Sequence, residues 1–263
     1  MLERTISVTI RHDSSVKPRA HDCAEAVTLL NRGNQKYAAI TEGGSGEVLM
    51  GTEAFGLSRE PGVTLPQEPF AAALGCSDAR VPLEQVLGGF ANDIFVARVA
   101  GNVPGGDVVG SLSYAIAHFP SSLQVVVVLG HTHCGAVTAA VDAVLDPATY
   151  LRLQGNLPLR GIVDAIVPAA TTAQAALTAV FGAEVKDREG YRQALIEVAV
   201  VCNAALSAVA LAKNLEKDVV FGVYDLDTRL VGLPGGKEGL VPAPSPQTLE
   251  EILIAACHSS FRE

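Results

Sequence analysis

The chain has 263 residues, 49% of them hydrophobic, with 28 acidic side chains against 19 basic ones. This length fits one large domain or two small ones, either of which can bury a sizeable core. The net charge of −9 argues against nucleic acid or an anionic membrane as a partner, because both require clustered Lys and Arg. No run of 18 or more residues lacks both a charge and a proline, so no membrane span is predicted. The most apolar stretch, 195–212, is expected to be a buried helix.

Two features favour a cytoplasmic location. Residues 2–12 mix charges with alternating apolar residues, which is typical of a short strand or arm and not of a secretory signal. The five cysteines are odd in number and widely spread, which argues against a disulfide framework. We therefore expect a reducing compartment, in which thiolates are free for metal binding or catalysis.

The first predicted helix covers residues 21–40. Apolar residues recur there at spacings near three and four, Asp22 is a candidate N-cap, and Gly43-Gly44 ends the pattern. Residues 1–20 form an irregular N-terminal extension in this interpretation. Residues 42–68 are rich in glycine, proline and polar residues, which predicts a loop.

Apolar runs predict four strands, one of which is interrupted only by Arg98, and such runs suit parallel strands buried on both faces. Between the first three lie two short helical patterns, at 83–87 and 108–119. This alternation predicts an α/β fold with a mainly parallel central sheet flanked by helices and an N-terminal helical arm. The runs are 70–75, 95–99, 123–129 and 219–224.

Residues 136–213 are alanine-rich and predicted to be mostly helical. We expect breaks at Pro147, Pro158, Pro168 and the polar segment 186–191. Residues 233–246 contain four prolines and predict an extended arm, followed by a short helix at 248–257. No repeat or linker marks a second domain. The expected organisation is an extension at 1–20, one domain at 21–233, and an arm with a short helix at 234–263.

Two predicted strands end in residue types that bind metals. Cys76 follows the first strand, and His131, His133 and Cys134 follow the third. Sites in parallel α/β sheets form beyond the carboxyl ends of the strands, where these side chains could meet. Thiolate and imidazole are the ligands that zinc prefers, and three protein ligands leave a fourth position open. A buried, inert cysteine is the alternative, and the spacing alone leaves His133 as a competitor of His131.

Several motifs closely resemble those of the β-class carbonic anhydrases. The resemblance is ordered along the chain and spans residues 21–233. Its central motifs are Cys76-Ser77-Asp78-Ala79-Arg80, Arg98-Val99-Ala100-Gly101-Asn102 and His131-Thr132-His133-Cys134-Gly135. The resemblance extends to residues 29–37, 110–115 and 222–225.

The resemblance implies a Zn²⁺ ion held by Cys76, His131 and Cys134. It also implies that Asp78 and Arg80 form a catalytic dyad. The implied reaction is the reversible hydration of carbon dioxide to bicarbonate by a zinc-bound hydroxide, which Asp78 orients while Arg80 holds Asp78. In part of this family the aspartate instead binds zinc as a fourth ligand, which gives a closed and inactive site.

The substrate pocket is the least determined part of the resemblance. We expect its walls to include six residues: Phe70, Phe95, Val99, Gly101, Asn102 and Tyr114. Many members have a Gln where our alignment places Gly89, so substrate handling can differ here. Members regulated by bicarbonate carry a Trp at the position of Ala73, and because this chain has no Trp we predict that this regulation is absent.

Two further histidines could shuttle protons, since imidazole titrates near neutral pH. His118, at a helix end, is more compatible with a capping or surface role, whereas His133 follows the predicted metal ligand closely. The remaining cysteines, Cys23, Cys202 and Cys257, have no activating context and are expected to be structural.

The apolar helices near 24–40 and 194–212 exceed what a small sheet can cover, which suggests an interface. The resemblance implies a homodimer or a dimer of dimers. Two alternative functions remain open: a zinc hydrolase of carbonyl sulfide or carbon disulfide, and an inactive zinc-stabilised scaffold. Intact dyad residues argue against the scaffold, because a scaffold needs only the metal ligands.

Overall fold

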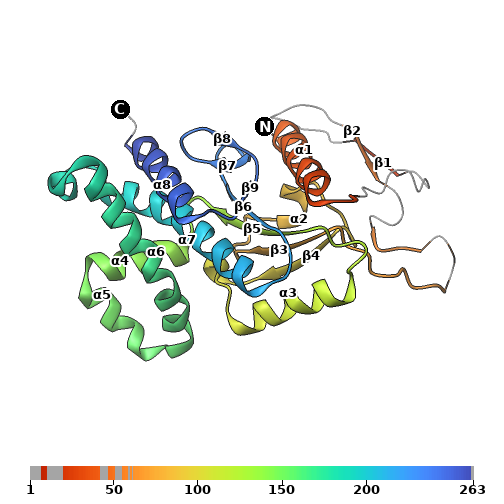
Figure 1. The fold of residues 1–263 in the computed structure, drawn as a ribbon, viewed down its shortest axis with the longest axis horizontal. Helices are drawn as coiled ribbons and strands as arrows, with labels where there is room; N and C mark the ends of the chain where they lie inside the picture. Colours follow the sequence, from red (N-terminus) through yellow and green to blue (C-terminus); the bar gives the residue numbers. More distant parts are fainter. Residues whose placement is uncertain are drawn as a thin grey trace.

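The computed structural model describes residues 7–10, 20–41, 47–50, 55–58, 60 and 62–261. Its centre is a seven-stranded sheet in which β3, β4, β5 and β6 are parallel, with the order β4-β3-β5-β6-β7-β8 and β9 pairing with β6 (Figure 1). The strands are β3 Ala71–Gly75, β4 Ile94–Arg98, β5 Val125–His131, β6 Val219–Tyr224, β7 Val231–Leu233, β8 Lys237–Glu238 and β9 Val241–Pro242. The prediction of a mainly parallel sheet is confirmed.

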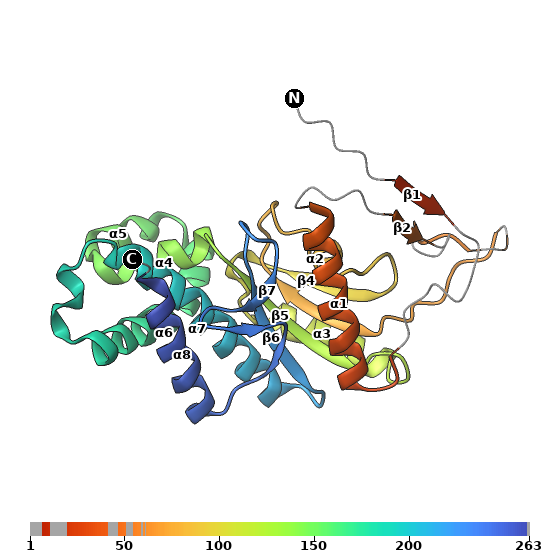
Figure 2. The same ribbon diagram turned by 90° about the horizontal axis from the view of Figure 1, so that it is seen from above.

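Helices cover both faces of this sheet. The bounds are α1 Cys23–Thr41, α2 Leu83–Val86, α3 Gly106–His118, α4 Gly135–Leu145, α5 Pro147–Arg152, α6 Leu157–Phe181, α7 Tyr191–Asn214 and α8 Pro246–Ser260. Helices α1 and α2 lie on one face, while α3 and α7 lie on the other (Figures 1 and 2). Helices α4, α6 and α8 pack around α7.

The alternation of side chains along the strands divides the core into two clusters. Ala72 and Leu74 of β3 point towards α7, whereas Ala71 and Ala73 point towards α1. All five residues of β3 and all seven of β5 are buried. Burial on both faces explains why these strands are continuous apolar runs.

The N-terminal part confirms one prediction and corrects another. Asp22 accepts a hydrogen bond from the Glu25 amide, so it caps α1 as predicted. The segment predicted as loop at 42–68 contains strand β2, Glu47–Met50, which pairs in parallel with β1, Ser7–Ile10. Residues distant in sequence form this pair, so the local composition of the segment could not indicate it.

The helix break predicted at Pro168 is absent, because Pro168 lies inside the 25-residue helix α6. Its ring removes one helical hydrogen-bond donor. The neighbouring buried residues Ile166, Ala169 and Ala170 belong to the core cluster around α7, so packing holds the helix together across the proline. Pro147 and Pro158 do mark breaks, since each lies in the first turn of a helix. The break predicted at 186–191 also separates α6 from α7.

The arm predicted at 233–246 is part of the sheet. Its strands β8 and β9 pair antiparallel with β7 and β6, and α8 then packs on α6 and α7. These contacts are between residues far apart in sequence, so the proline content alone indicated only an extended chain.

By length and composition alone, α6 and α7 could each cross a membrane. In α7, 78% of the most apolar 18-residue window is buried inside the protein, which confirms the predicted buried helix. In α6 the corresponding share is 33%, and its buried side packs against α4 and α7.

Candidate metal centre

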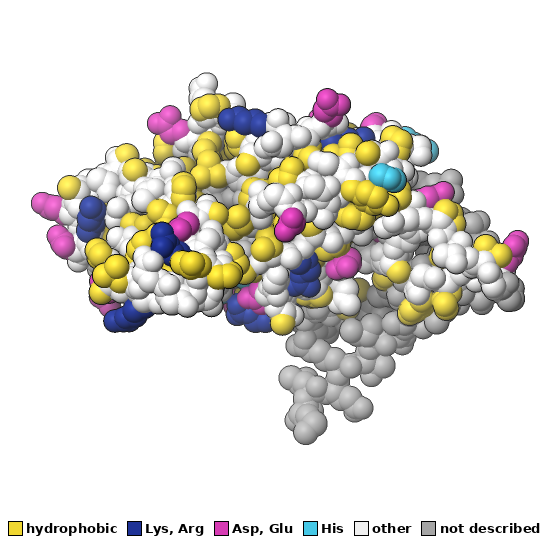
Figure 3. Space-filling model, turned by 90° about the horizontal axis from the view of Figure 1, so that it is seen from below, with side chains coloured by type: hydrophobic (Ala, Val, Ile, Leu, Met, Phe, Trp, Pro, Cys, Tyr) yellow, Lys and Arg dark blue, Asp and Glu magenta, His cyan; other side chains and the backbone are white. Residues whose placement is uncertain are grey.

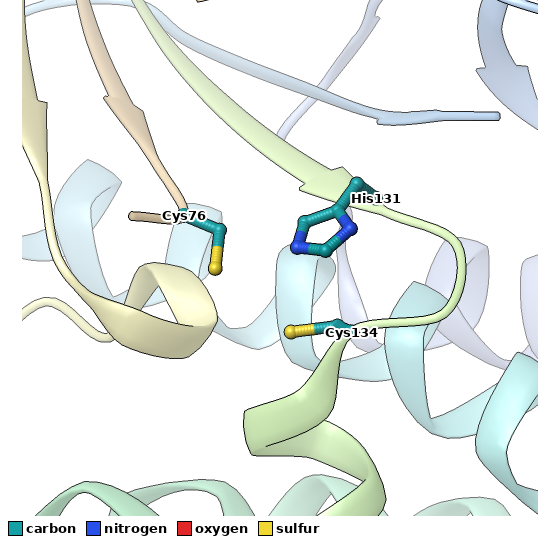
Figure 4. A group of neighbouring side chains, drawn as sticks. All are labelled: Cys76, His131 and Cys134. Atoms are coloured by element: carbon teal, nitrogen blue, oxygen red, sulfur yellow. The ribbon is translucent and has the colours of Figure 1, made fainter. Parts of the chain in front are cut away.

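The three predicted ligands meet at the carboxyl edge of the sheet. Cys76 directly follows β3, His131 is the last residue of β5, and Cys134 directly precedes α4. Because β3 and β5 are parallel neighbours, with Gly75 paired to Leu129, their ends lie side by side. Figure 4 shows the three side chains converging on a shared space.

The ligand atoms of Cys76, His131 and Cys134 all lie within 4.8 Å of one another, and all three residues are buried. The His131 Nδ1 atom is 2.8 Å from the Thr132 carbonyl oxygen, so it carries the proton and donates it there. The Nε2 atom is buried and has no hydrogen-bond partner. An unprotonated ring nitrogen between two thiols is a donor set that fits Zn²⁺.

The two buried thiols influence each other's ionisation. The contact with Cys134 lowers the pKa of Cys76. The same contact, with burial, raises the pKa of Cys134. Zinc binds thiolates, so metal loading would release the proton of Cys134.

Asp78 and Arg80 form a bidentate ion pair beside these ligands. The Arg80 Nε and Nη2 atoms donate to the two Asp78 carboxylate oxygens at 3.0 and 2.7 Å. The Arg80 side chain lowers the pKa of Asp78 to about 2, so Asp78 is charged at neutral pH. Its Oδ2 atom lies 3.9 Å from His131 Nε2.

Arg98 is a site residue whose role the sequence did not reveal. Its guanidinium donates to the carbonyl oxygens of Cys76 at 2.9 Å and Asp78 at 2.7 Å. It therefore anchors the backbone of the loop that carries both the first ligand and the dyad. The available signals were its place in the Arg98–Asn102 motif and its charge in an otherwise apolar strand.

The structure brings only half of the predicted pocket residues to the metal centre. Val99 bonds to Gly75, and the Gly101 amide donates to Cys76 Sγ at 3.3 Å. The neighbouring Asn102 is buried, and its Nδ2 atom has no partner. Val99, Gly101 and Asn102 thus lie beside the first ligand.

The other three predicted pocket residues lie elsewhere in this chain. Phe70 precedes β3, six residues before Cys76, or about 20 Å along an extended strand. Phe95 pairs with Ala72 near the amino end of β3. The half-exposed Tyr114 ring lies 6.5 Å from that of Phe95. Aromatic character in a strand or helix does not indicate which sheet edge the side chain faces, and the pocket role of these three residues stays a prediction.

Ala73 and Gly89, the positions linked above to bicarbonate regulation and to substrate handling, lie away from the metal centre. Ala73 points towards α1, into the cluster opposite the ligands. A Cβ atom at Gly89 would lie 2.7 Å from Ile94 Cδ1, at the amino end of β4.

The two candidate shuttle histidines differ in position. His118 lies in the last turn of α3, bonds to the Tyr114 carbonyl oxygen and stacks on the Tyr114 ring at 3.8 Å. This agrees with a capping role. His133 has a positive φ of 55° and lies 3.8 Å from Asp227, so it faces outwards beside the centre.

All five cysteines are free thiols. Cys202 and Cys257 are buried, and burial raises the pKa of their thiols to about 12 and about 11. Both are therefore inert, as predicted. Within the part of the chain that the structure describes, Cys76, His131 and Cys134 form the one cluster of His, Cys, Asp or Glu suited to a metal ion.

The fold and the site define an α/β protein with a Cys-His-Cys metal centre at the carboxyl ends of parallel strands. Residues 71–231, more than half of the chain, match the family described as carbonic anhydrase. The chain therefore belongs to the β-class carbonic anhydrase family, as the motifs predicted.

Curated relatives match over a shorter region. Carbonic anhydrase 2 of Mycobacterium tuberculosis (strain H37Rv) is 37% identical over 110 residues, which cover 41% of this chain and 48% of the relative. Carbonic anhydrase of Mycolicibacterium smegmatis is 37% identical over 116 residues, which cover 43% and 52%. The chain thus spans about half the length of the curated relatives it matches.

Solved structures match over more of the chain at lower identity. The β-carbonic anhydrase CcaA has a TM-score of 0.49 and 23% identity, covering 69% of this chain and 80% of its own. The Coccomyxa β-carbonic anhydrase in complex with acetazolamide has a TM-score of 0.48 and 22% identity, covering 82% and 87%.

Proposed function

We propose that the protein is a zinc enzyme that interconverts carbon dioxide and bicarbonate. The observation that carries this proposal is the buried His131 Nε2 atom, which has no partner and faces two cysteines. A buried ring nitrogen without a partner is costly unless a ligand takes its lone pair. Family membership points to the reaction.

Cys76, His131 and Cys134 would hold the ion. Zinc supplies Lewis acidity, which makes a nucleophile from water near neutral pH. The Thr132 carbonyl keeps the proton on His131 Nδ1, and Arg98 anchors the backbone of Cys76. These contacts fix the ligands before the metal arrives, so binding needs little rearrangement.

Asp78 is the proposed hydrogen-bond acceptor that orients the reacting group in the site. Its carboxylate is charged, lies beside His131 and can accept a hydrogen bond from a water or hydroxyl group that reacts there. Arg80 donates hydrogen bonds to both carboxylate oxygens of Asp78 and also to the His133 carbonyl oxygen at 3.2 Å. It thereby connects Asp78 to the loop that follows β5. While this pair is intact, Asp78 is held by Arg80 and is not free to act as a fourth ligand.

The reaction is tested with the zinc-loaded chain in parallel assays of carbon dioxide hydration and carbonyl sulfide hydrolysis. We expect carbon dioxide to be the faster substrate. A faster reaction with carbonyl sulfide would replace this proposal with the hydrolase. If wild type and Asp78→Ala were equally inactive while binding zinc normally, the scaffold function would replace it.

We also propose that the chain works as a homodimer in the cytoplasm. The observations that support a dimer are the edge position of β4 and the aromatic side chains of Phe95, Tyr114 and Phe119 next to it. Figure 3 shows the α3 side from below, where hydrophobic side chains gather in groups between scattered charges. Sedimentation equilibrium would test this assembly, and a monomer at micromolar concentration would contradict it.

A further inference from the structure

Asn203 is a buried polar residue in the middle of α7, among apolar neighbours. Its residue exposure is 4%, and Val201, Cys202, Ala204 and Ala205 on either side are fully buried. Burying an amide is unfavourable unless it is hydrogen-bonded. The Asn203 Nδ2 atom donates to the Gly101 carbonyl oxygen at 2.8 Å, across 102 residues of sequence.

Gly101, whose carbonyl accepts this hydrogen bond, is closely packed. It has a positive φ of 68°, which favours glycine. A Cβ atom there would lie 2.5 Å from Ile166 Cδ1 of α6 and 3.1 Å from Ala136 Cβ of α4. Three helices, α4, α6 and α7, therefore meet at this one residue.

The backbone N–H group of Gly101 faces the metal centre. This amide donates to Cys76 Sγ at 3.3 Å, while the Gly101 carbonyl accepts from Asn203. The two bonds form a chain from α7 through Gly101 to the first metal ligand.

We propose that Asn203 is a positioning residue for the metal centre, which keeps the Gly101 amide directed at the Cys76 sulfur. The inference rests on the proposed zinc site but does not depend on which reaction the site performs. An N–H group on a thiolate stabilises its negative charge and fixes its direction. Partners of this kind typically change metal affinity by about 10–100-fold.

The test compares Asn203→Leu, which keeps the branching at Cγ but removes the donor, with Ser207→Ala. Ser207 is equally buried and lies one turn further along the same helix, so it controls for loss of a buried polar group. Zinc affinity is measured by competition with a chelator. We expect about 10–100-fold weaker binding for Asn203→Leu and wild-type binding for Ser207→Ala.

Loading the site with cobalt(II) gives an absorption band that reports on the electron density of the cysteine sulfur. A thiolate that has lost an N–H donor gives up charge more readily, so the sulfur-to-cobalt absorption band of Asn203→Leu should move to longer wavelength. The band of Ser207→Ala should match wild type. Asn203→Ala, which only removes atoms, replaces Asn203→Leu if the latter does not give the wild-type circular dichroism spectrum.

Unchanged zinc affinity and an unchanged cobalt band in a folded Asn203 variant would overturn the inference. Both readouts are independent of carbon dioxide hydration, so an inactive wild type that binds zinc would contradict only the proposed reaction. A wild type that does not bind zinc would contradict both the proposed site and this inference.

Discussion

The two faces of the sheet each contain a buried asparagine, and the two residues serve different purposes. Asn34 in α1 is 3% exposed, and Asn203 in α7 is 4% exposed. Asn34 donates to the Val86 and Arg229 carbonyl oxygens and accepts from the Val231 amide, which fastens α1 to α2 and β7. Asn203 donates to Gly101, whose amide bonds to the metal ligand Cys76. The two asparagines are thus equally buried, and only their hydrogen-bond partners distinguish them.

The strand pattern explains why the chemistry lies on one side. Cys76 and Cys134 belong to the cluster that contains α7, whereas the cluster beneath α1 contains no metal ligand among its described members. The α1 face is therefore expected to determine stability, and the α7 face to determine both stability and metal binding. The following changes test this division, from the largest expected effect to the smallest.

Cys134→Ser removes one proposed zinc ligand. We expect zinc affinity to fall by more than the roughly 100-fold that loss of an outer partner causes, and hydration activity to fall to background. Metal analysis after dialysis against a chelator measures the first effect. Cys202→Ser is the matched control, since that cysteine is equally buried and does not belong to the cluster. Equal zinc retention in the two variants would contradict the ligand assignment.

Asp78→Asn keeps the shape of the side chain but removes its charge and part of its capacity to accept hydrogen bonds. We expect carbon dioxide hydration to fall by about 10²–10⁴-fold while zinc stays bound. Stopped-flow hydration assays with parallel metal analysis measure both. Asp227→Asn changes an exposed aspartate near His133 and should leave the rate unchanged. Wild-type activity in Asp78→Asn would remove Asp78 from the mechanism.

Asn34→Leu leaves the Val86 and Arg229 carbonyls and the Val231 amide without their partner. We expect the free energy of unfolding to fall by about 1–3 kcal/mol. Urea denaturation followed by circular dichroism measures it. Zinc affinity per folded molecule should stay at the wild-type value, in contrast to Asn203→Leu. A loss of zinc affinity as large as that of Asn203→Leu would abolish the distinction between the two faces.

Much of the fold and the metal centre followed from local patterns. Continuous apolar runs marked β3, β5 and β6, because strands covered on both faces favour apolar side chains along most of their length. Cys76 and the His131–Cys134 pair could be brought together because parallel strands end at a common edge.

The remaining features depend on contacts between distant residues. The pairing of β1 with β2, the continuity of α6 through Pro168 and the Asn203–Gly101 bond have no local signature. The positions of Phe70, Phe95 and Tyr114 were predicted from residue type alone, which does not specify a sheet edge. Arg98 could be noticed as a charge in an otherwise apolar strand, but its acceptors became clear only from the folded loop.

The central claim is that Cys76, His131 and Cys134 hold a zinc ion with which the chain hydrates carbon dioxide. The most direct test is stopped-flow carbon dioxide hydration by the wild-type chain before zinc removal, after removal and after zinc is restored. We predict catalysis that disappears with the metal and returns when one equivalent of zinc is added. A chain that carries one equivalent of zinc at these residues and gives no rate above buffer would contradict the account.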